Sequence, residues 1–499
     1  MTNSNPRSTE NSAQKLDRIS TGIDGLDRIL HGGLILERSY LIRGRPGTGK
    51  TILGLHYLTH GVAQNDTALY INLEEATENI EQNAAALGFD VDAIHFLDLS
   101  PKSEFFAGNQ SYDLFESSEV ERDPIVEEIT EKVSALQPDR VFVDPISQLR
   151  YLSTDEYQFR KQALSFMRLL GEVGATVLFT TQATDDAPDD DLQFMSDGTI
   201  ELGYASTGRS ISVPKFRGSA TRGGDHAVKI TDDGLVVYPE LAPSDYGQAF
   251  VDEPISSGVP ELDELLNGGL DRGTVTVISG PTGVGKTTTG TQFMNEAAGR
   301  GERSVMYLFE ENESTFTRRS EAVNIPVGEM RNRGTLTVEE IEALDTSPQE
   351  FANMVRHEVE EEGAQLVMID GISGYKLALE GQEDELVTNL HALGRYLKNM
   401  GVTVLMIEEV ENITGGFQAT DVGISYLADN IVFLRHLELH GEMRKVIGVL
   451  KMRTSDFERT LREFEITERG ITVGESLTQL RGILSGTPEW TDSEKSDTQ

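Results

Sequence analysis

The amino-acid sequence predicts an α/β protein with two tandem domains, each a mostly parallel sheet flanked by helices, with antiparallel strands at its C-terminal end. Three observations predict this fold class. The chain repeats itself, because "ISTGIDGLDRILHGGL" from Ile19 returns as "ISSGVPELDELLNGGL" from Ile255, 236 residues later. Short apolar runs rich in β-forming residues alternate with helix-like segments in each half. These runs are continuous, which indicates parallel strands buried on both faces of a sheet.

The strand signals follow the same order in both halves. The expected strands of the first half are 39–44, 67–75, 139–144 and 175–182, and those of the second are 275–280, 304–311, 365–370 and 402–409. Later β-rich runs are expected to add antiparallel strands at 209–218, 226–239, 443–453 and 461–473. The first half is ten residues longer before its aspartate-ended strand, and we expect this extra length in the acidic residues 103–123.

Length and local composition divide the chain into domains. Its 499 residues are enough for about two to four domains of common size. We place the border within residues 239–254, because this segment is rich in proline and lacks periodicity. The expected parts are a disordered N-terminal segment (1–16), a first domain (17–243), a second domain (244–488) and an acidic tail (489–499).

Acidic residues dominate the composition. The chain has 83 Asp and Glu against 43 Lys and Arg, a formal net charge of -40, and the acids are spread along its length. Salt screens such self-repulsion, so a high-salt cytoplasm would explain this composition. An ordinary acidic mesophile protein is the alternative. In either case the composition does not suggest a broad basic surface for nucleic acid.

The sequence also excludes several classes of protein. It contains no cysteine, which rules out disulfides, thiol catalysis and cysteine-ligated metals and fits a reducing compartment. The polar N-terminus "MTNSNPRSTENSAQ" lacks the apolar core of a signal peptide. No apolar run approaches the roughly 20 residues that a membrane span needs. We therefore expect a cytoplasmic protein with no membrane association.

Two glycine-rich loops carry the clearest chemical signal. "GRPGTGKT" and "GPTGVGKT" both match G-x-x-x-x-G-K-[ST], and each stands between an expected strand and helix. Backbone N–H groups of such a loop surround phosphate oxygens, and its lysine reaches the β- and γ-phosphates of ATP. The candidate ATP-binding residues are Gly44, Gly47, Thr48, Gly49, Lys50, Thr51 and Ile52 in the first loop, and Gly280, Thr282, Gly283, Val284, Gly285, Lys286, Thr287 and Thr288 in the second.

Two aspartates stand where a magnesium ligand is expected. Asp144 and Asp370 each end an apolar strand, "VFVD" and "VMID". A carboxylate at this place holds Mg²⁺ in phosphate-loop enzymes, together with the loop hydroxyl, here Thr51 or Thr287. An aspartate at a strand end can also merely cap the next helix. Given the two loops, we expect Mg²⁺ and ATP as the cofactors.

Hydrolysis also needs a group that orients or deprotonates water. The residues after the two aspartates, Pro145 and Gly371, cannot serve. Two pairs of adjacent acids, one in each half, are the candidates. Each pair ends a strand that is expected to neighbour the loop strand of its half. Alternatively, the acids are simply solvated at the surface. These candidate catalytic residues are Glu74, Glu75, Glu310 and Glu311.

Both halves carry a K-x-R motif at the same offset. Alternation along a strand places the two cations on one face. They could pair with surface acids, or they could reach the γ-phosphate of ATP bound by a neighbouring subunit, as an arginine finger does. The four residues are Lys215, Arg217, Lys451 and Arg453.

Taken together, these motifs resemble the RecA-like ATPases, and specifically the double-domain KaiC family. The resemblance spans roughly residues 17–489 and is closest in "TDVGISYLADNIVFLRHLELHGEMRKVIGVLKMR". It implies two RecA-like domains in a homo-hexameric double ring, with ATP between subunits and the K-x-R cations supplied in trans. It also implies that Glu74 and Glu310 accept the proton, that the first domain is mainly an ATPase, and that the second also phosphorylates its own hexamer. With the charge, it suggests a halophilic archaeon as the source.

The sequence departs from the family at the phosphorylated segment. Clock members of the family carry adjacent Ser and Thr acceptors within "ISTIT", whereas this chain reads "ISYLA". Ser425 occupies the serine position and is the candidate phosphoacceptor, but Tyr426 replaces the threonine. Thr454 also replaces the glycine that follows the first K-x-R motif. A two-site phosphorylation cycle is therefore not expected, and phosphorylation of Ser425 stays open.

Three functions are weighed. The first is an ATP-hydrolysing KaiC-like regulator, with serine/threonine autokinase activity of the second domain left open. The second is a DNA-dependent RecA-like recombinase or helicase, since the fold class does not choose between them. DNA binding should show basic loops, and residues 217–226 form the one mildly basic loop. The net charge of -40 weighs against nucleic acid without excluding it. The third is a nucleotide-gated assembly scaffold. Protein partners and the regulated process do not follow from the sequence.

Overall fold

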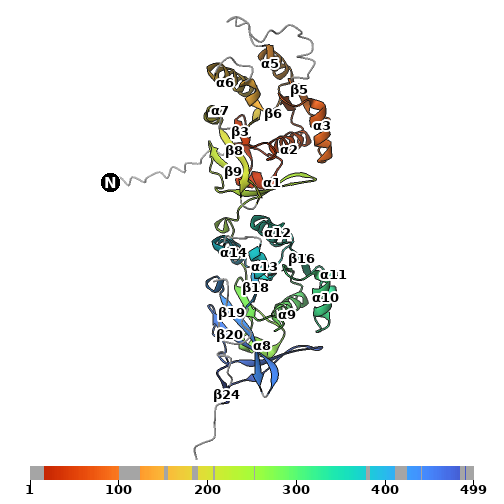
Figure 1. The fold of residues 1–499 in the computed structure, drawn as a ribbon, viewed down its shortest axis with the longest axis vertical. Coiled ribbons are helices and arrows are strands. Elements are labelled where there is room, and N and C mark those ends of the chain that lie inside the picture. Colours follow the sequence, from red (N-terminus) through yellow and green to blue (C-terminus); the bar gives the residue numbers. More distant parts are fainter. Residues whose placement is uncertain are drawn as a thin grey trace, which may run out of the picture. The chain divides into compact units, whose positions relative to one another are not determined.

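The protein forms two compact units, Met1–Glu240 and Leu241–Gln499, each of which is described by itself (Figure 1). The computed structural model describes residues 16–100, 124–150, 156–182, 189–205, 208–251, 253–377, 383–410, 424–439, 441–483 and 489–490. The expected long acidic insertion at 103–123 therefore lies outside the described residues, as do 1–15 and 491–499. In the described part, no helix is long and apolar enough to cross a membrane.

The first unit is built on one nine-stranded sheet of order β11-β10-β9-β8-β3-β7-β6-β4-β5. Strands β3 to β8 of this sheet pair in parallel, and β9, β10 and β11 add antiparallel strands. The strands are β3 (Ser39–Gly44), β4 (Ala68–Asn72), β5 (His95–Asp98), β6 (Arg140–Asp144), β7 (Thr176–Thr181), β8 (Gly198–Ala205), β9 (Gly208–Phe216), β10 (His226–Thr231) and β11 (Gly234–Tyr238), with a separate pair β1 (Arg18–Ile19) and β2 (Leu34–Ile35).

Helices cover both faces of this sheet because successive strand residues point to opposite sides. Tyr40 and Ile42 of β3 pack into the core under α2 and α3, whereas Leu41 between them packs into the core under α5 and α6. The helices are α1 (Asp24–Ile29), α2 (Lys50–Ala63), α3 (Thr77–Ala86), α5 (Pro124–Leu136), α6 (Glu156–Glu172) and α7 (Asp190–Met195), with the 3-10 turn η1 (Ile146–Arg150).

The second unit repeats this plan, with a nine-stranded sheet of order β16-β15-β17-β18-β14-β19-β20-β21-β22. Here β14 to β19 pair in parallel and β20, β21 and β22 are antiparallel. The strands are β14 (Val275–Gly280), β15 (Ser304–Leu308), β16 (Leu336–Glu340), β17 (Leu366–Asp370), β18 (Thr403–Glu409), β19 (Asn430–Leu439), β20 (Glu442–Met452), β21 (Arg462–Thr467) and β22 (Gly470–Ser476), with the small pairs β12 (Pro254–Ile255) and β13 (Leu270–Asp271), and β23 (Leu480–Arg481) and β24 (Glu489–Trp490).

Two apolar layers again enclose the sheet. Ile278 of β14 packs into the core that contains α9, α10 and α11, and its neighbour Val277 packs toward α12, α13 and α14 (Figure 1). The helices are α8 (Pro260–Leu265), α9 (Lys286–Gly299), α10 (Glu313–Glu321), α11 (Val327–Asn332), α12 (Pro348–Glu360), α13 (Ile372–Leu377) and α14 (Glu383–Asn399), with 3-10 turns η2 (Pro243–Asp245) and η3 (Ile424–Tyr426). The predicted fold class, two RecA-like domains, is thereby confirmed.

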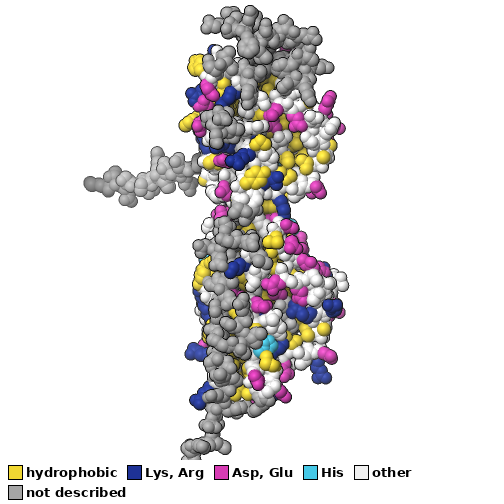
Figure 2. Space-filling model, in the orientation of Figure 1, with side chains coloured by type: hydrophobic (Ala, Val, Ile, Leu, Met, Phe, Trp, Pro, Cys, Tyr) yellow, Lys and Arg dark blue, Asp and Glu magenta, His cyan; other side chains and the backbone are white. Residues whose placement is uncertain are grey.

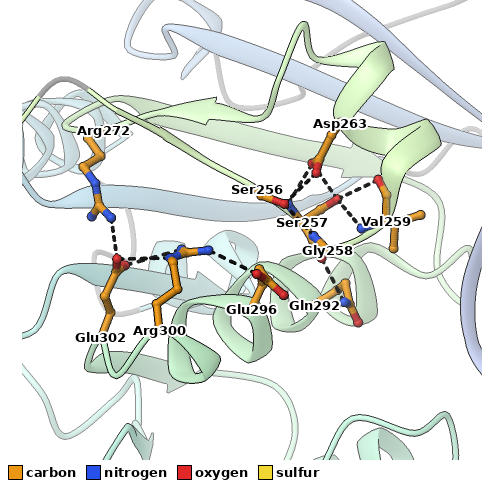
Figure 3. A network of polar contacts seen from close by, with 10 residues as sticks. All are labelled: Ser256, Ser257, Gly258, Val259, Asp263, Arg272, Gln292, Glu296, Arg300 and Glu302. Carbon is orange, nitrogen blue, oxygen red and sulfur yellow. Dashed lines mark hydrogen bonds and ion pairs between the residues drawn. The ribbon is translucent and has the colours of Figure 1, made fainter.

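The repeated segment at the start of each unit is a hydrogen-bonded turn. In the second unit the Asp263 carboxylate accepts from the hydroxyls of Ser256 and Ser257, at 2.6 and 2.7 Å, and Gln292 on α9 donates to the Ser257 carbonyl at 2.9 Å (Figure 3). Asp27 binds Ser20 in the same way at 2.5 Å. The Ser and Asp spacing within the repeat thus forms the same turn in both units, and in the second unit this turn braces α9 through Gln292.

One expectation about strand order is wrong. Strand β4, which leads to Glu74 and Glu75, was expected beside the loop strand β3, but β7 and β6 lie between them. Consecutive strands are neighbours only about two-thirds of the time, because a crossover helix can carry the chain past other positions. Acidic side chains are spread over the visible face of each unit among Lys and Arg, in keeping with their even distribution along the chain (Figure 2).

Two candidate nucleotide sites

The first glycine-rich loop joins the end of β3 to the start of α2. Gly49 directly precedes α2 with φ of 106°, a left-handed conformation that favours glycine. Lys50 is 7% exposed, and its Nζ donates to the carbonyls of Gly44 and Arg45 at 2.8 and 3.1 Å. Burial lowers the pKa of Lys50, whereas the carboxylates of Asp144 and Glu74 raise it. The lysine is therefore held inside the loop, close to two acids.

Three hydroxyl groups surround Asp144 at the end of β6. Its Oδ2 accepts from Thr51 Oγ1 at 2.7 Å and from the Tyr70 hydroxyl at 3.1 Å, and its Oδ1 accepts from Thr180. The strand register makes this possible, because Asp144 lies level with Asn72 of β4 and Val143 lies level with Phe179 of β7. Asp144 therefore does not serve as a simple helix cap; it lies directly beside the loop threonine.

A cavity of about 490 Å³ opens at this edge of the first sheet. The loop lysine, Asp144 and the two acids Glu74 and Glu75 all line it. Gln182 donates to Glu74 at 3.3 Å and Asn83 donates to Glu75 at 3.3 Å. Although β4 is two strands away from the position first expected, its end still faces the loop, because parallel strands share one carboxyl edge.

The second loop is built in the same way between β14 and α9. Gly285 has φ of 114°, and an added Cβ would come within 2.4 Å of Ile466 Cδ1. Lys286 is 8% exposed; its Nζ donates to the Pro281 carbonyl at 2.9 Å and lies 3.8 Å from Oε2 of Glu409. Burial lowers the pKa of Lys286, and nearby carboxylates, Glu409 first among them, raise it.

The aspartate of the second site has different surroundings. Thr287 hydrogen-bonds Asp370, as Thr51 does Asp144. The positions of Tyr70 and Thr180, however, are taken by Met306 and Ile407, which belong to the apolar core. Burial raises the pKa of Asp370 to about 6, against smaller opposing contributions from Thr287 and Arg319. The two sites therefore share the loop and the aspartate but differ in polarity around the carboxylate.

The acid pairs are also held differently. Glu311 forms an ion pair with Arg319 of α10 at 2.6 Å, in the place where Asn83 holds Glu75. Glu310 is exposed, and its side chain lies against Gly371 and Gly374, where an added Cβ would approach it to 2.9 and 3.4 Å. The second site thus has a charged partner where the first has a neutral amide.

Both K-x-R motifs contact their own chain. Lys451 donates to the carbonyls of Ser425 and Ala428 at 2.9 and 2.6 Å, and Arg453 donates to that of Tyr426 at 3.0 Å. Lys215 and Arg217 hold the end of α7 in the same manner. Each arginine also lies near an acid: Arg453 is 3.6 Å from Asp429 and Arg217 is 3.8 Å from Asp197.

The strand register places these motifs far from the loop of their own unit. Lys215 lies level with Thr199, which in turn lies level with Leu41 of β3, and Arg217 lies two residues further from the loop. Arg217 is therefore about five residues below Gly44, or roughly 17 Å at 3.3 Å per residue. In the second unit Lys451 pairs with Ile431, level with Val277, which gives the same offset.

Ser425 lies in η3, immediately before β19. Its side chain is exposed, and that of Tyr426 is 52% exposed. The turn is fixed through its carbonyls by the second K-x-R motif. Part of the quoted motif, residues 420–423 and residue 440, lies outside the described residues. The structure thus presents the hydroxyl at the surface, on a segment whose backbone is held.

Sequence reasoning did not identify several residues of these sites. The first site adds Tyr70, Thr180, Gln182 and Asn83, and the second adds Arg319, Glu409 and Lys445, which donates to the Gly283 carbonyl at 3.1 Å. Gln182 directly follows β7 and Glu409 ends β18, so their place at the carboxyl edge could have been read from the sequence. The others depend on register and could not.

Comparison with known proteins agrees with this architecture. The family model "ATPase: KaiC" matches residues 19–242 and again residues 255–478. The circadian clock oscillator protein KaiC of Acaryochloris marina is 27% identical over 489 residues, which cover 95% of this chain and 92% of the relative. KaiC of Prochlorococcus marinus subsp. pastoris is 29% identical over 499 residues, covering 97% and 96%. The circadian clock protein KaiC3 of Synechocystis is 27% identical, covering 95% of each chain. This protein is therefore an ATP-binding ATPase, and it belongs to the KaiC family.

Proposed function

We propose that each half of the chain binds one ATP in its glycine-rich loop and hydrolyses it with Mg²⁺. The observation that carries this proposal is the contact between the loop threonine and the strand-end aspartate, 2.7 Å from Thr51 Oγ1 to Asp144 Oδ2 and repeated by Thr287 and Asp370. A hydroxyl and a carboxylate at this distance can share one Mg²⁺ that also binds phosphate oxygens. The loop residues named from the sequence would bind the phosphates.

The donor set fits magnesium rather than a fully protein-bound metal. Among the described residues, no group of three or more His, Asp or Glu side chains could hold a metal ion. Mg²⁺ commonly takes only one or two carboxylates and keeps water and substrate phosphates as its other ligands. Thr51 with Asp144, and Thr287 with Asp370, would supply those protein ligands. The ion would neutralise charge that develops on the transferred phosphoryl group.

The first glutamate of each pair would orient and deprotonate the attacking water. Glu74 lines the cavity together with Lys50 and Asp144, which supports this role, and Gln182 would hold its carboxylate in position. Glu310 would act in the second site. The second glutamates, Glu75 and Glu311, are tied to the following helix and would position that segment.

The K-x-R cations would act on ATP bound by a neighbouring copy. Along the strand direction the arginine of each motif lies roughly 17 Å from its own loop and the lysine roughly 10 Å, so the arginine cannot reach its own nucleotide. A ring of identical subunits, a homo-hexamer in this family, would bring each motif to the next subunit's loop. Within its own chain the motif would hold the turn that carries Phe194 or Tyr426.

Serine autokinase activity of the second half is a second candidate, carried by the exposed Ser425. Lys451 fixes the Ser425 carbonyl, so a γ-phosphate reached by this motif in the assembled ring would lie near the serine hydroxyl. Incubation with ATP followed by mass spectrometry of the Ser425 peptide tests this. An unmodified peptide at high occupancy would remove the kinase from the proposal.

We further propose a regulatory role, in the cytoplasm, for domains spanning 17–243 and 244–488. The clock names of the relatives in cyanobacteria and the two compact units support this. The KaiC family match favours it over a DNA-dependent recombinase or helicase. A nucleotide-gated scaffold without turnover is disfavoured because both sites retain a full set of candidate residues. The partners are not identified by the site.

Phosphate release tests the proposal directly. Purified full-length protein should release phosphate from Mg·ATP, and Lys50→Ala and Lys286→Ala should each remove part of this activity. We expect loss on the order of a hundredfold or more when both lysines are replaced, because each contributes phosphate binding and charge stabilisation. The assay should include molar KCl, given the net charge of -40. Equal rates in the double variant and the parent would refute hydrolysis at these loops.

A further inference from the structure

The two loop lysines have different partners. In the first site Lys50 Nζ donates to two backbone carbonyls, those of Gly44 and Arg45. In the second site Lys286 Nζ donates to one carbonyl, that of Pro281, and has the Glu409 carboxylate at 3.8 Å. Lys50 thus hydrogen-bonds neutral carbonyls directly, whereas Lys286 has a neutral carbonyl and also the carboxylate of Glu409, which ends β18.

The strand register shows which residue of the first site corresponds to Glu409. Glu409 lies level with Gly280, the first residue of the second loop. In the first unit Thr181 lies level with Arg43, so the next residue, Gln182, stands level with Gly44. The same position at the edge of the sheet therefore carries a neutral amide in one site and a carboxylate in the other.

The position is close to where the last phosphate of ATP would lie. Strand β18, which ends at Glu409, runs between the loop strand β14 and the aspartate-ended strand β17. Glu409 therefore ends a strand that lies between the loop strand and the strand of Asp370, and its carboxylate is 3.8 Å from Lys286 Nζ. A loop lysine reaches the β- and γ-phosphates. The Glu409 side chain is 44% exposed, so its charge is screened by solvent but not removed.

We propose that Glu409 is a specificity-determining residue that lowers the preference of the second site for ATP over ADP. Its carboxylate would pair with Lys286 when the γ-phosphate position is empty and would repel a γ-phosphate that enters it. ADP lacks that group, so its binding would be affected less. The inference rests on the proposed function, since it requires ATP in the second loop. It assigns the two loops different nucleotide preferences, with the first site the more selective for ATP.

The test uses the full-length chain with one loop silenced by replacement of its lysine. In the Lys50→Ala background, calorimetry measures binding of Mg·ADP and of Mg·AMP-PNP, an ATP analogue that is not turned over, to the second site. Glu409→Gln should raise affinity for Mg·AMP-PNP about tenfold, which corresponds to about 1.4 kcal/mol, and change that for Mg·ADP much less. Glu409→Asp keeps the charge and should keep the parent preference.

The reciprocal variant makes the result independent of the folding of any one protein. In the Lys286→Ala background, Gln182→Glu should lower the preference of the first site for Mg·AMP-PNP over Mg·ADP by a similar factor, about tenfold. An unchanged preference in both Glu409→Gln and Gln182→Glu would overturn the inference while leaving nucleotide binding intact. Weaker Mg·AMP-PNP binding in Glu409→Gln would also overturn it, because it would mean that Glu409 assists the γ-phosphate. Absence of binding in both single-lysine backgrounds would overturn the proposed function as well.

Discussion

Replacement of Asp370 by asparagine should stabilise the second unit in a pH-dependent way. Burial raises the pKa of the Asp370 carboxyl to about 6, compared with 3.8 for the unperturbed group. The folded state therefore binds more protons than the unfolded state between these values, and stability falls as the pH rises through this window. Above this pH window, the ionised Asp370 destabilises the folded state by the full amount. An asparagine cannot ionise, so Asp370→Asn removes the effect.

The magnitude follows from the size of the shift. A difference of about 2 pKa units corresponds to about 3 kcal/mol at 1.36 kcal/mol per unit, so the variant should gain about 3 kcal/mol at pH 8. At pH 5 much of the carboxyl is still protonated in the folded state, and the gain should be about half as large. For a unit of this size, the gain at pH 8 should raise Tm by about 6 to 12 °C.

Calorimetric melting with EDTA, without nucleotide, measures the difference between variant and parent at each pH. The matched control is Asp144→Asn, whose carboxylate accepts from three hydroxyls. Asparagine keeps one acceptor oxygen, but its amide nitrogen cannot accept, so at least one of the three hydroxyls loses its acceptor and this variant should lower Tm at both pH values. A stabilisation by Asp370→Asn that does not change between pH 5 and pH 8, or no stabilisation at all, would refute the reasoning.

Two further predictions concern backbone conformation and charge. Gly285→Ala should destabilise the second unit by about 1 to 2 kcal/mol and abolish nucleotide binding there, because φ of 114° disfavours any Cβ and Ile466 leaves no room for it. Calorimetric melting and binding check this, and unchanged binding of Mg·AMP-PNP would contradict it. Raising KCl from about 0.1 to 1 M should raise Tm, because the Debye length falls from about 10 to 3 Å and screens a net charge of -40. A Tm that stays unchanged or falls as KCl is raised would show that charge repulsion does not limit stability.

Much of the architecture could be predicted from the sequence because its signals are local. Consecutive residues define the loops, the buried strands and the aspartates at 144 and 370. The repeat shows each of these features twice. Strand order was the exception, since β7 and β6 lie between β3 and β4. No local sequence pattern indicates which strands a crossover connection passes over before the next strand joins the sheet.

The difference between the two sites lies beyond any local pattern. Thr180 and Ile407 occupy corresponding positions in "LFTTQ" and "LMIEE", yet their effect on Asp144 and Asp370 follows only once the strands are aligned. Residues 36 positions apart become neighbours because parallel strands bring their carboxyl edges together.

The sequence by itself determined that this protein has two glycine-rich loops, two strand-end aspartates and two K-x-R motifs on repeated α/β domains. Only the tertiary structure decided what surrounds them: three hydroxyls at Asp144, an apolar setting at Asp370, and a carboxylate beside Lys286. It also placed each K-x-R motif at the opposite edge of the sheet from its own loop. The physical reason is that polarity, charge and reach at a site depend on strand register, which joins residues from distant parts of the chain.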